Sequence, residues 1–144
     1  MNNVIFANAD ELMYYACVLQ NLAKIDNDYS QCEKEYIDNI LKTYSAIVPN
    51  ACYEEIIAGI ENIDIKDAIE EINKNQQIAR FLLRDLIILG NIDGVYSEEE
   101  RCWIANYASL FNMSIEDFSA LEKAIATQFS AQKEIDLIIC KKNL

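Results

Sequence analysis

The sequence predicts an all-α protein that folds as a single-domain bundle of about seven helices. Its 144 residues are 52% hydrophobic and 25% charged, and they include only three Gly and one Pro. So few chain breakers favour helices over a strand-rich fold, which would need more turn residues. The length suits one domain, spanning residues 1–144, with enough apolar side chains to form a core.

An internal repeat appears at an offset of 67 residues. Aligning Leu19–Asn39 with Leu86–Asn106 gives nine identities in 21 positions. The identical pairs are Leu19/Leu86, Leu22/Leu89, Ile25/Ile92, Asp26/Asp93, Tyr29/Tyr96, Ser30/Ser97, Glu33/Glu100, Ile37/Ile104 and Asn39/Asn106. This similarity predicts a duplicated helix–loop–helix unit over residues 12–46 and 79–113. We expect the two units to be related by a near two-fold rotation and to bury six shared residues in one core, namely Leu19, Leu22, Ile37, Leu86, Leu89 and Ile104.

Helices are predicted on both sides of each repeated loop and in the segments outside the repeats. Apolar residues recur at helical spacing before the second loop, for example at Leu82, Leu86 and Leu89. One or two shorter helices bridge the units, and the first is expected to begin at an Asn50 cap. After the second unit, Ser114 is a cap signature. It precedes an apolar stripe at Phe118, Leu121, Ile125 and Phe129, and a separate short helix is expected through Ile135, Leu137 and Ile138.

Each repeated loop ends in the pattern Ser-x-x-Glu, which is typical of a capping box. Ser30 and Glu33 form the first pair, and Ser97 and Glu100 form the second. In such a box the Ser side chain accepts from the third helical N–H, and the Glu side chain accepts from the Ser amide. Before the second box, Gly94 can adopt the positive φ that a turn requires. Helix capping alone therefore accounts for the repeated Ser and Glu residues.

The same loops also contain candidate metal ligands. Asp93, Gly94 and Glu100 have the spacing of positions 5, 6 and 12 of a calcium-binding loop. Position 1 would then be Leu89, which has no oxygen to offer, so a single loop lacks ligands. A site shared between the loops is the remaining alternative. The candidate ligands are Asp26, Glu33, Asp93 and Glu100, although capping is the favoured role for Glu33 and Glu100.

The motifs around the second loop resemble the TerB-like family. The similarity lies in D-G followed by a Ser cap, E-E-E, an apolar helix and the second cap in LFNMSIEDFSALEKAI. That family is named for tellurite resistance and also forms the N-terminal part of some DnaJ-type membrane co-chaperones. The resemblance implies an all-helical fold, a role in stress response or scaffolding, and acidic loops that are candidate metal sites. This chain departs from the family pattern at Asn27, where Gly is usual, and at Lys24 beside Asp26.

Charge and cysteine content restrict the partners and the compartment. The net charge of −12 repels phosphate backbones and anionic membranes, so no nucleic acid is expected as a partner. The five cysteines form no C-x-x-C pair, which indicates reduced residues of the core. The N-terminus lacks the features of a signal peptide, and charged residues interrupt the most apolar run, so we expect a cytoplasmic chain without direct membrane insertion.

Three classes of function follow from these observations. The absence of His removes Ser-His and Cys-His nucleophile pairs, so we expect no catalytic residues and a protein that is not an enzyme. An acidic interaction or sensing module that binds other proteins is favoured, with no cofactor beyond a divalent metal ion at the loops. The alternative is a small-molecule-binding protein or a hydrolase that uses carboxylates or a metal. The oligomeric state does not follow from the sequence.

Overall fold

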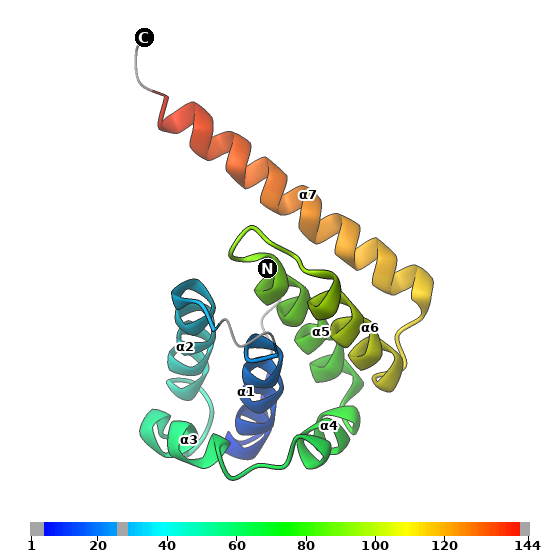
Figure 1. The fold of residues 1–144 in the computed structure, drawn as a ribbon. Coiled ribbons are helices and arrows are strands. Elements are labelled where there is room, and N and C mark those ends of the chain that lie inside the picture. The colour runs from blue at the N-terminus through cyan, green and yellow to red at the C-terminus, as the bar shows by residue number, and fades with distance from the viewer. Residues whose placement is uncertain (1–4, 26–28, 142–144) are drawn as a thin grey trace.

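The computed structural model describes residues 5–25 and 29–141, and within that part of the chain it contains helices and no strands (Figure 1). The all-α prediction is confirmed. The helices are α1 (Ala9–Ala23), α2 (Gln31–Ser45), α3 (Tyr53–Ile60), α4 (Ile65–Asn73), α5 (Gln76–Asn91), α6 (Glu98–Leu110) and α7 (Ile115–Ile139).

Helices α1 and α5 lie at the centre of the bundle. Helix α1 packs against α2, α3, α4 and α5, while α5 packs against α4, α6 and α7 (Figure 1). The predicted unit 12–46 therefore holds α1 and α2, and the unit 79–113 holds α5 and α6, with the first helix of one unit against the first helix of the other. The near two-fold relation between the units stays a prediction.

Six of the repeated apolar residues lie in the core, as predicted from the repeat. Each has no more than 2% of its surface exposed. They are Leu19, Leu22, Ile37, Leu86, Leu89 and Ile104. The cysteines differ from the prediction, because Cys17 is buried whereas Cys32, Cys102 and Cys140 are exposed. All five are free thiols.

Helix starts follow the capping residues in most places. Asn8, Asp64, Asn75 and Ser114 each accept a hydrogen bond from the first turn of the helix that follows. The prediction for α3 is wrong. Asn50 has φ of +60°, so it forms a left-handed turn after Pro49, and the helix begins after Cys52 without a side-chain cap. Asn adopts left-handed backbone geometry more readily than most residues, so Asn50 forms the turn before α3 and does not cap the helix.

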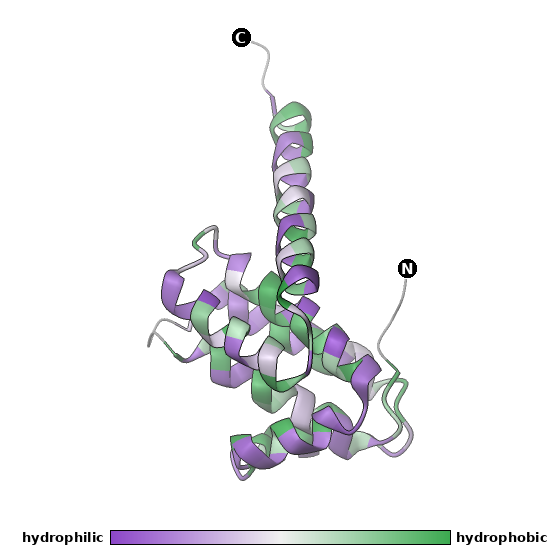
Figure 2. Cartoon of the chain, turned by 90° about the vertical axis from the view of Figure 1, so that its right-hand side faces the viewer, coloured by the Kyte–Doolittle hydropathy of each residue, from purple (hydrophilic) through white to green (hydrophobic). Residues whose placement is uncertain are grey.

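The two helices expected after Ser114 are one helix, α7, of 25 residues. No Gly or Pro interrupts residues 115–139, so nothing in the local sequence ends the helix between its two apolar segments. Its first half packs on the body through Phe118 and Ile125. The segment 130–139, called here the distal segment of α7, is exposed at every residue and projects from the body (Figures 1 and 2).

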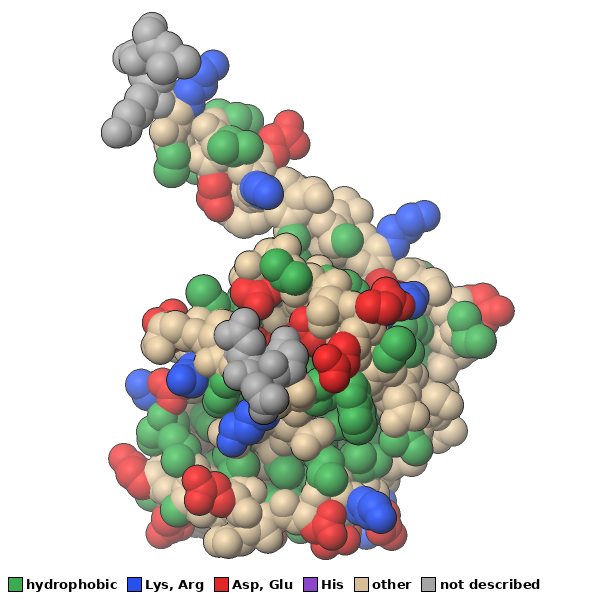
Figure 3. All heavy atoms as spheres, in the orientation of Figure 1, with side chains coloured by type: hydrophobic (Ala, Val, Ile, Leu, Met, Phe, Trp, Pro, Cys, Tyr) green, Lys and Arg blue, Asp and Glu red, His purple; other side chains and the backbone are tan. Residues whose placement is uncertain are grey.

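Four large apolar side chains of the distal segment are 48–73% exposed, namely Ile135, Leu137, Ile138 and Ile139. Figure 3 shows hydrophobic side chains gathered at this end of α7, mixed with acidic and basic ones. No helix in the described ranges combines the length and the apolar composition needed to cross a bilayer.

Candidate functional site

The first repeated loop leads into a complete capping box at the start of α2. The Ser30 side chain accepts from the Glu33 amide at 3.2 Å, and the Glu33 carboxylate accepts from the Ser30 amide at 3.1 Å. Glu33 is 3% exposed, so this carboxylate is used inside the fold. Asp26, the other candidate ligand of this loop, lies outside the described residues, as does Asn27.

The second loop forms the same box at the start of α6. The Ser97 hydroxyl accepts from the Glu100 amide at 3.1 Å and donates to the Glu100 carboxylate at 2.9 Å, and the Ser97 amide donates to that carboxylate at 3.3 Å. Gly94 has φ of +85°, as the turn signal predicted. The Asp93 carboxylate accepts from the Val95 amide at 3.0 Å, so it closes the turn that precedes the box.

The three described candidate ligands are thus held by their own loops. Glu33 and Glu100 lie in separate capping boxes, and Asp93 lies in the Gly94 turn. Within residues 5–25 and 29–141, no cluster of three or more acidic or cysteine side chains is arranged to hold a metal ion. Because Asp26 is not described, the four-residue site remains a prediction. The capping role of Glu33 and Glu100 is confirmed.

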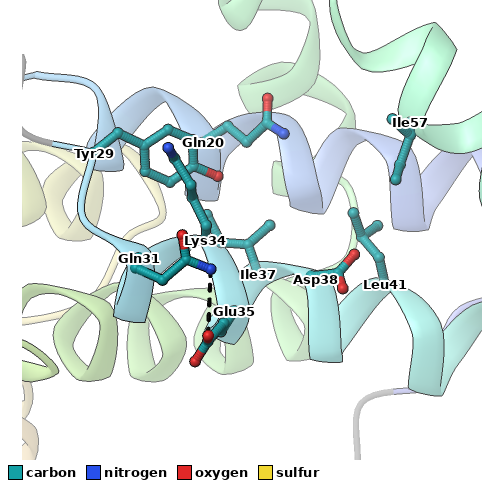
Figure 4. A pocket seen from close by; sticks show the side chains of 9 residues that line it. All are labelled: Gln20, Tyr29, Gln31, Lys34, Glu35, Ile37, Asp38, Leu41 and Ile57. Carbon is teal, nitrogen blue, oxygen red and sulfur yellow. Dashed lines mark hydrogen bonds between the residues drawn. The ribbon is translucent and has the colours of Figure 1, made fainter.

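The loop tyrosines differ in their surroundings. Tyr29 lies between two lysines, with Lys34 Nζ 5.2 Å and Lys24 Nζ 5.8 Å from the ring centre. Tyr29 and Lys34 line a hollow of about 260 Å³ between α1, α2 and α3, in which the Lys34 side chain reaches toward the ring (Figure 4). The one hydrogen bond drawn in this hollow joins Gln31 and Glu35.

Tyr96, the counterpart of Tyr29, connects the second loop to α7. Its ring packs on Gly90, where an added Cβ would lie 3.0 Å from the ring carbons. Its hydroxyl donates to Glu122 at 2.8 Å, and Arg101 binds the same carboxylate through two nitrogens at 3.0 and 3.1 Å. Burial and the neighbouring Glu122 carboxylate raise the pKa of Tyr96. This contact holds the first half of α7 against α6.

A buried polar cluster connects the two units. Asp85 of α5 is 3% exposed and accepts hydrogen bonds from the Tyr15 hydroxyl of α1 and, at 3.0 Å, from the Tyr36 hydroxyl of α2. Arg84 Nε lies 3.1 Å from the same carboxylate. Burial, followed by the Asp85 charge, raises the pKa of both tyrosines. With its oxygens occupied, Asp85 acts as a cross-link between three helices.

Sequence reasoning missed both the Asp85 cluster and the Glu122 contact. The available signal for the first was the adjacent pair Arg84-Asp85 inside the apolar run FLLRDLIILGNI, because a charged residue in such a run must find partners when the helix is buried. The partners themselves are 70 and 49 residues away in the sequence, so local spacing could not identify them.

Two hollows lie along the junction of α5 and α7 and are together called the groove here. Its wider part has a volume of about 750 Å³ and is lined by Arg80, Phe81 and Arg84 of α5 and by Met113 and Leu121 near the start of α7, among others. The Arg84 guanidinium stacks on Phe81 at 4.9 Å. A second hollow farther along the same two helices is lined by Ile88 and Phe129 with two glutamines. The groove is therefore largely apolar, and one end carries Arg80 and Arg84 together with Asp117.

Comparison with known proteins identifies one family. The model of the family described as tellurite resistance protein TerB matches residues 13–123. The match spans α1 to α6 and the first part of α7, so the distal segment of α7 lies beyond it. No curated protein and no solved structure matches the chain.

Proposed function

We propose a function from the premise that the chain belongs to the TerB family of tellurite resistance proteins. The protein is a non-enzymatic interaction module that works within a bacterial stress-response complex and binds other proteins in the cytoplasm. The observation that carries this proposal is the distal segment of α7, whose large apolar side chains are exposed on a helix that leaves the body.

An exposed apolar helix end is costly for a protein in water unless a partner covers it. A helix that is apolar on several sides is usually buried, and contiguous exposed apolar surface marks interaction sites. Leu137, Ile138 and Ile139 are adjacent in sequence and therefore point to different sides of α7. This arrangement suits contact with a protein surface that surrounds the helix end.

The polar groups of the body support an interaction role better than a catalytic one. The two buried glutamates serve as helix caps, and Asp85 is held by three donors. Every buried side-chain N or O in the described ranges has a hydrogen-bond partner. These carboxylates are committed to the fold and are not presented to a substrate.

The test is capture of partners by the full-length chain in its host, with and without tellurite stress. The double variant Leu137→Glu/Ile138→Glu is compared with a control, Ile47→Glu/Val95→Glu, which changes two apolar residues that are similarly exposed on the body. Both variants should keep the wild-type melting temperature, because none of the four side chains is buried. The first should lose the captured proteins and fail to restore tellurite resistance to a strain lacking the chain.

The control should keep both properties. If the distal variant retains the same partners and the same resistance as wild type, the proposed role of the distal segment is wrong. If the purified protein turns over a substrate without any partner, the interaction role is replaced by an enzymatic one.

A further inference from the structure

One side of α7 carries a second stripe of mostly apolar residues next to the one that packs on the body, and Leu121 belongs to both. The residues of the second stripe are spaced alternately by three and four, which is the repeat of a helix that pairs with another helix. They are Leu121, Ala124, Gln128, Ala131, Ile135 and Ile138. Apart from the half-buried Leu121, all of them are exposed. We call this set the α7 stripe.

The α7 stripe borders the groove between α5 and α7. Leu121 lines the wide part of the groove, and Gln128 lines the narrower part. On the other side, α5 presents residues at helical spacing, from Arg80 and Arg84 to Ile88. A further helix placed in this groove would contact both α5 and the α7 stripe.

We propose that the occupant of the groove is α7 of a second copy of this chain, running antiparallel. This inference rests on the proposed function in taking the distal segment of α7 as a contact surface, and it names the partner of that surface. The pairing is a two-fold symmetric dimer in which each groove receives the distal segment of the other copy. Two-fold dimers are the commonest closed assemblies, and their contacts are reciprocal.

The order of side chains along the stripe favours the antiparallel direction. With the symmetry axis between residues 128 and 131, Leu121 faces Ile138 of the second copy and Ala124 faces its Ile135. Gln128 then faces Ala131. Two of the three layers place a small residue opposite a larger one, which lets the helices approach closely. A parallel pair would instead place Ala opposite Ala, leaving gaps in those layers.

Charge supports the same direction. The chain has three arginines, and two of them, Arg80 and Arg84, line the groove beside the start of α7. Asp117 lines the same end, so the groove end keeps one net positive charge. Antiparallel pairing brings the distal segment of the second copy there, and its Lys133, Glu134 and Asp136 sum to one net negative charge. Arg80 is exposed and has no ion-pair partner among the described residues. Opposite charges at this end offset locally the repulsion between two chains of net charge −12.

A stable dimer also needs a larger interface than the two distal segments alone provide. Four exposed apolar side chains are fewer than the roughly 20 to 30 residues per partner of a standard interface. Pairing along the whole of α7, about 37 Å from its rise per residue, adds both grooves to the contact. The projection of α7 beyond its own body leaves room beside the distal segment for the body of the second copy (Figure 2).

The test measures the oligomeric state of the full chain by sedimentation equilibrium over a range of concentrations. Wild type should be a dimer. Ala124→Glu and Ile138→Glu should each raise the dimer dissociation constant by about 100-fold, since each puts a charge into an apolar layer. Ser130→Glu is the matched control, because it adds the same charge to an exposed site on another side of α7, and it should leave the constant unchanged.

Direction is tested by disulfide trapping in a chain with the exposed cysteines Cys32, Cys102 and Cys140 replaced by Ser. Mixed Ala124→Cys and Ile135→Cys chains, carrying different tags, should form a crosslinked heterodimer, and neither should crosslink to itself. Self-crosslinking at both positions indicates a parallel pair and contradicts the proposed register.

The charge contact is tested by charge reversal. A loss of dimer affinity in Arg80→Glu that Glu134→Arg restores would support this contact, and no coupling between these variants would contradict it.

The outcomes separate this inference from the proposed function. A wild-type chain that is monomeric at all concentrations overturns the dimer. If Leu137→Glu/Ile138→Glu still loses other captured proteins in that case, the proposed function stands and a different protein occupies the groove. A dimer that depends on the α7 stripe, combined with unchanged partners and resistance, supports the inference and removes the proposed function.

Discussion

The two repeated units have the same local structure and use it differently. Each contains two helices joined by a loop that ends in a capping box with a buried Glu. In the first unit, α2 is tied to the centre of the bundle through Tyr36 and Asp85. In the second, the counterpart of Tyr36 is Trp103, which is 41% exposed, and α6 is tied outward to α7 through Arg101 and Glu122.

This difference shows that both units kept the two helices and the capping box. Single residues that the two units do not share decide how each unit contacts the other helices of the bundle. Asp85 aligns with Val18, so the inward contact exists in one unit only. Glu122 lies beyond both units. The second unit is therefore the one that carries α7, and with it the surface proposed for partners.

The largest expected effect comes from removing the inward contact. Asp85→Ala leaves two tyrosine hydroxyls and a guanidinium without their carboxylate, so we expect the free energy of unfolding to fall by about 3 kcal/mol. Glu122→Ala removes the outward contact from a less buried position and should cost about 1 kcal/mol. Urea denaturation of both variants measures the difference. Equal losses would show that the inward and outward contacts contribute equally to the free energy of unfolding.

High pH should weaken the same inward contact. The pKa values of Tyr15 and Tyr36 are raised in the fold above the ordinary value of 10.0, so the unfolded chain loses these protons first. Their contribution is fully present below pH 10 and is lost as pH rises above it, by at most about 1.4 kcal/mol per pH unit for each tyrosine. Unfolding measured from pH 8 to 11 should show a smaller decline in Tyr36→Phe than in wild type. A decline in Tyr36→Phe as steep as that of wild type would show that the Tyr36–Asp85 contact does not weaken at high pH.

The capping boxes should behave alike in the two units. Ser30→Ala and Ser97→Ala each remove the acceptor for a first-turn amide, and each should lower the stability by about 1 kcal/mol. Thermal unfolding of the two variants provides the comparison. A loss confined to one unit would mean that the loops are not equivalent, although both contain a complete capping box.

The smallest effects are expected where capping and metal binding make opposite predictions. Glu100→Gln keeps an acceptor for the Ser97 amide, so the loss should be well under about 1 kcal/mol. Melting temperatures of wild type, Glu100→Gln and Asp93→Asn should not depend on added calcium, magnesium or zinc. A bound metal would instead stabilise wild type by roughly 2.7 kcal/mol at a hundred times its dissociation constant. Metal-dependent melting that disappears in both variants would establish the loops as a metal site.

The sequence by itself determined the features that depend on neighbouring residues. The capping boxes join residues three apart, and the buried face of each helix follows from its own periodicity, so the roles of Ser97, Glu100 and Leu86 follow from local spacing alone. The family resemblance rests on the same local motifs, and the match over residues 13–123 confirms it.

Only the tertiary structure decided which distant side chains meet. Tyr15 reaches Asp85 across 70 residues and Tyr96 reaches Glu122 across 26, and such pairs depend on how helices pack, which local spacing does not encode. The same holds for α7. Its apolar pattern was visible in the sequence, but whether Phe118 and Ile138 share one core depends on where the body ends. The body covers Phe118 and leaves Ile138 in solvent, because a straight helix of 25 residues is longer than the surface on which it packs.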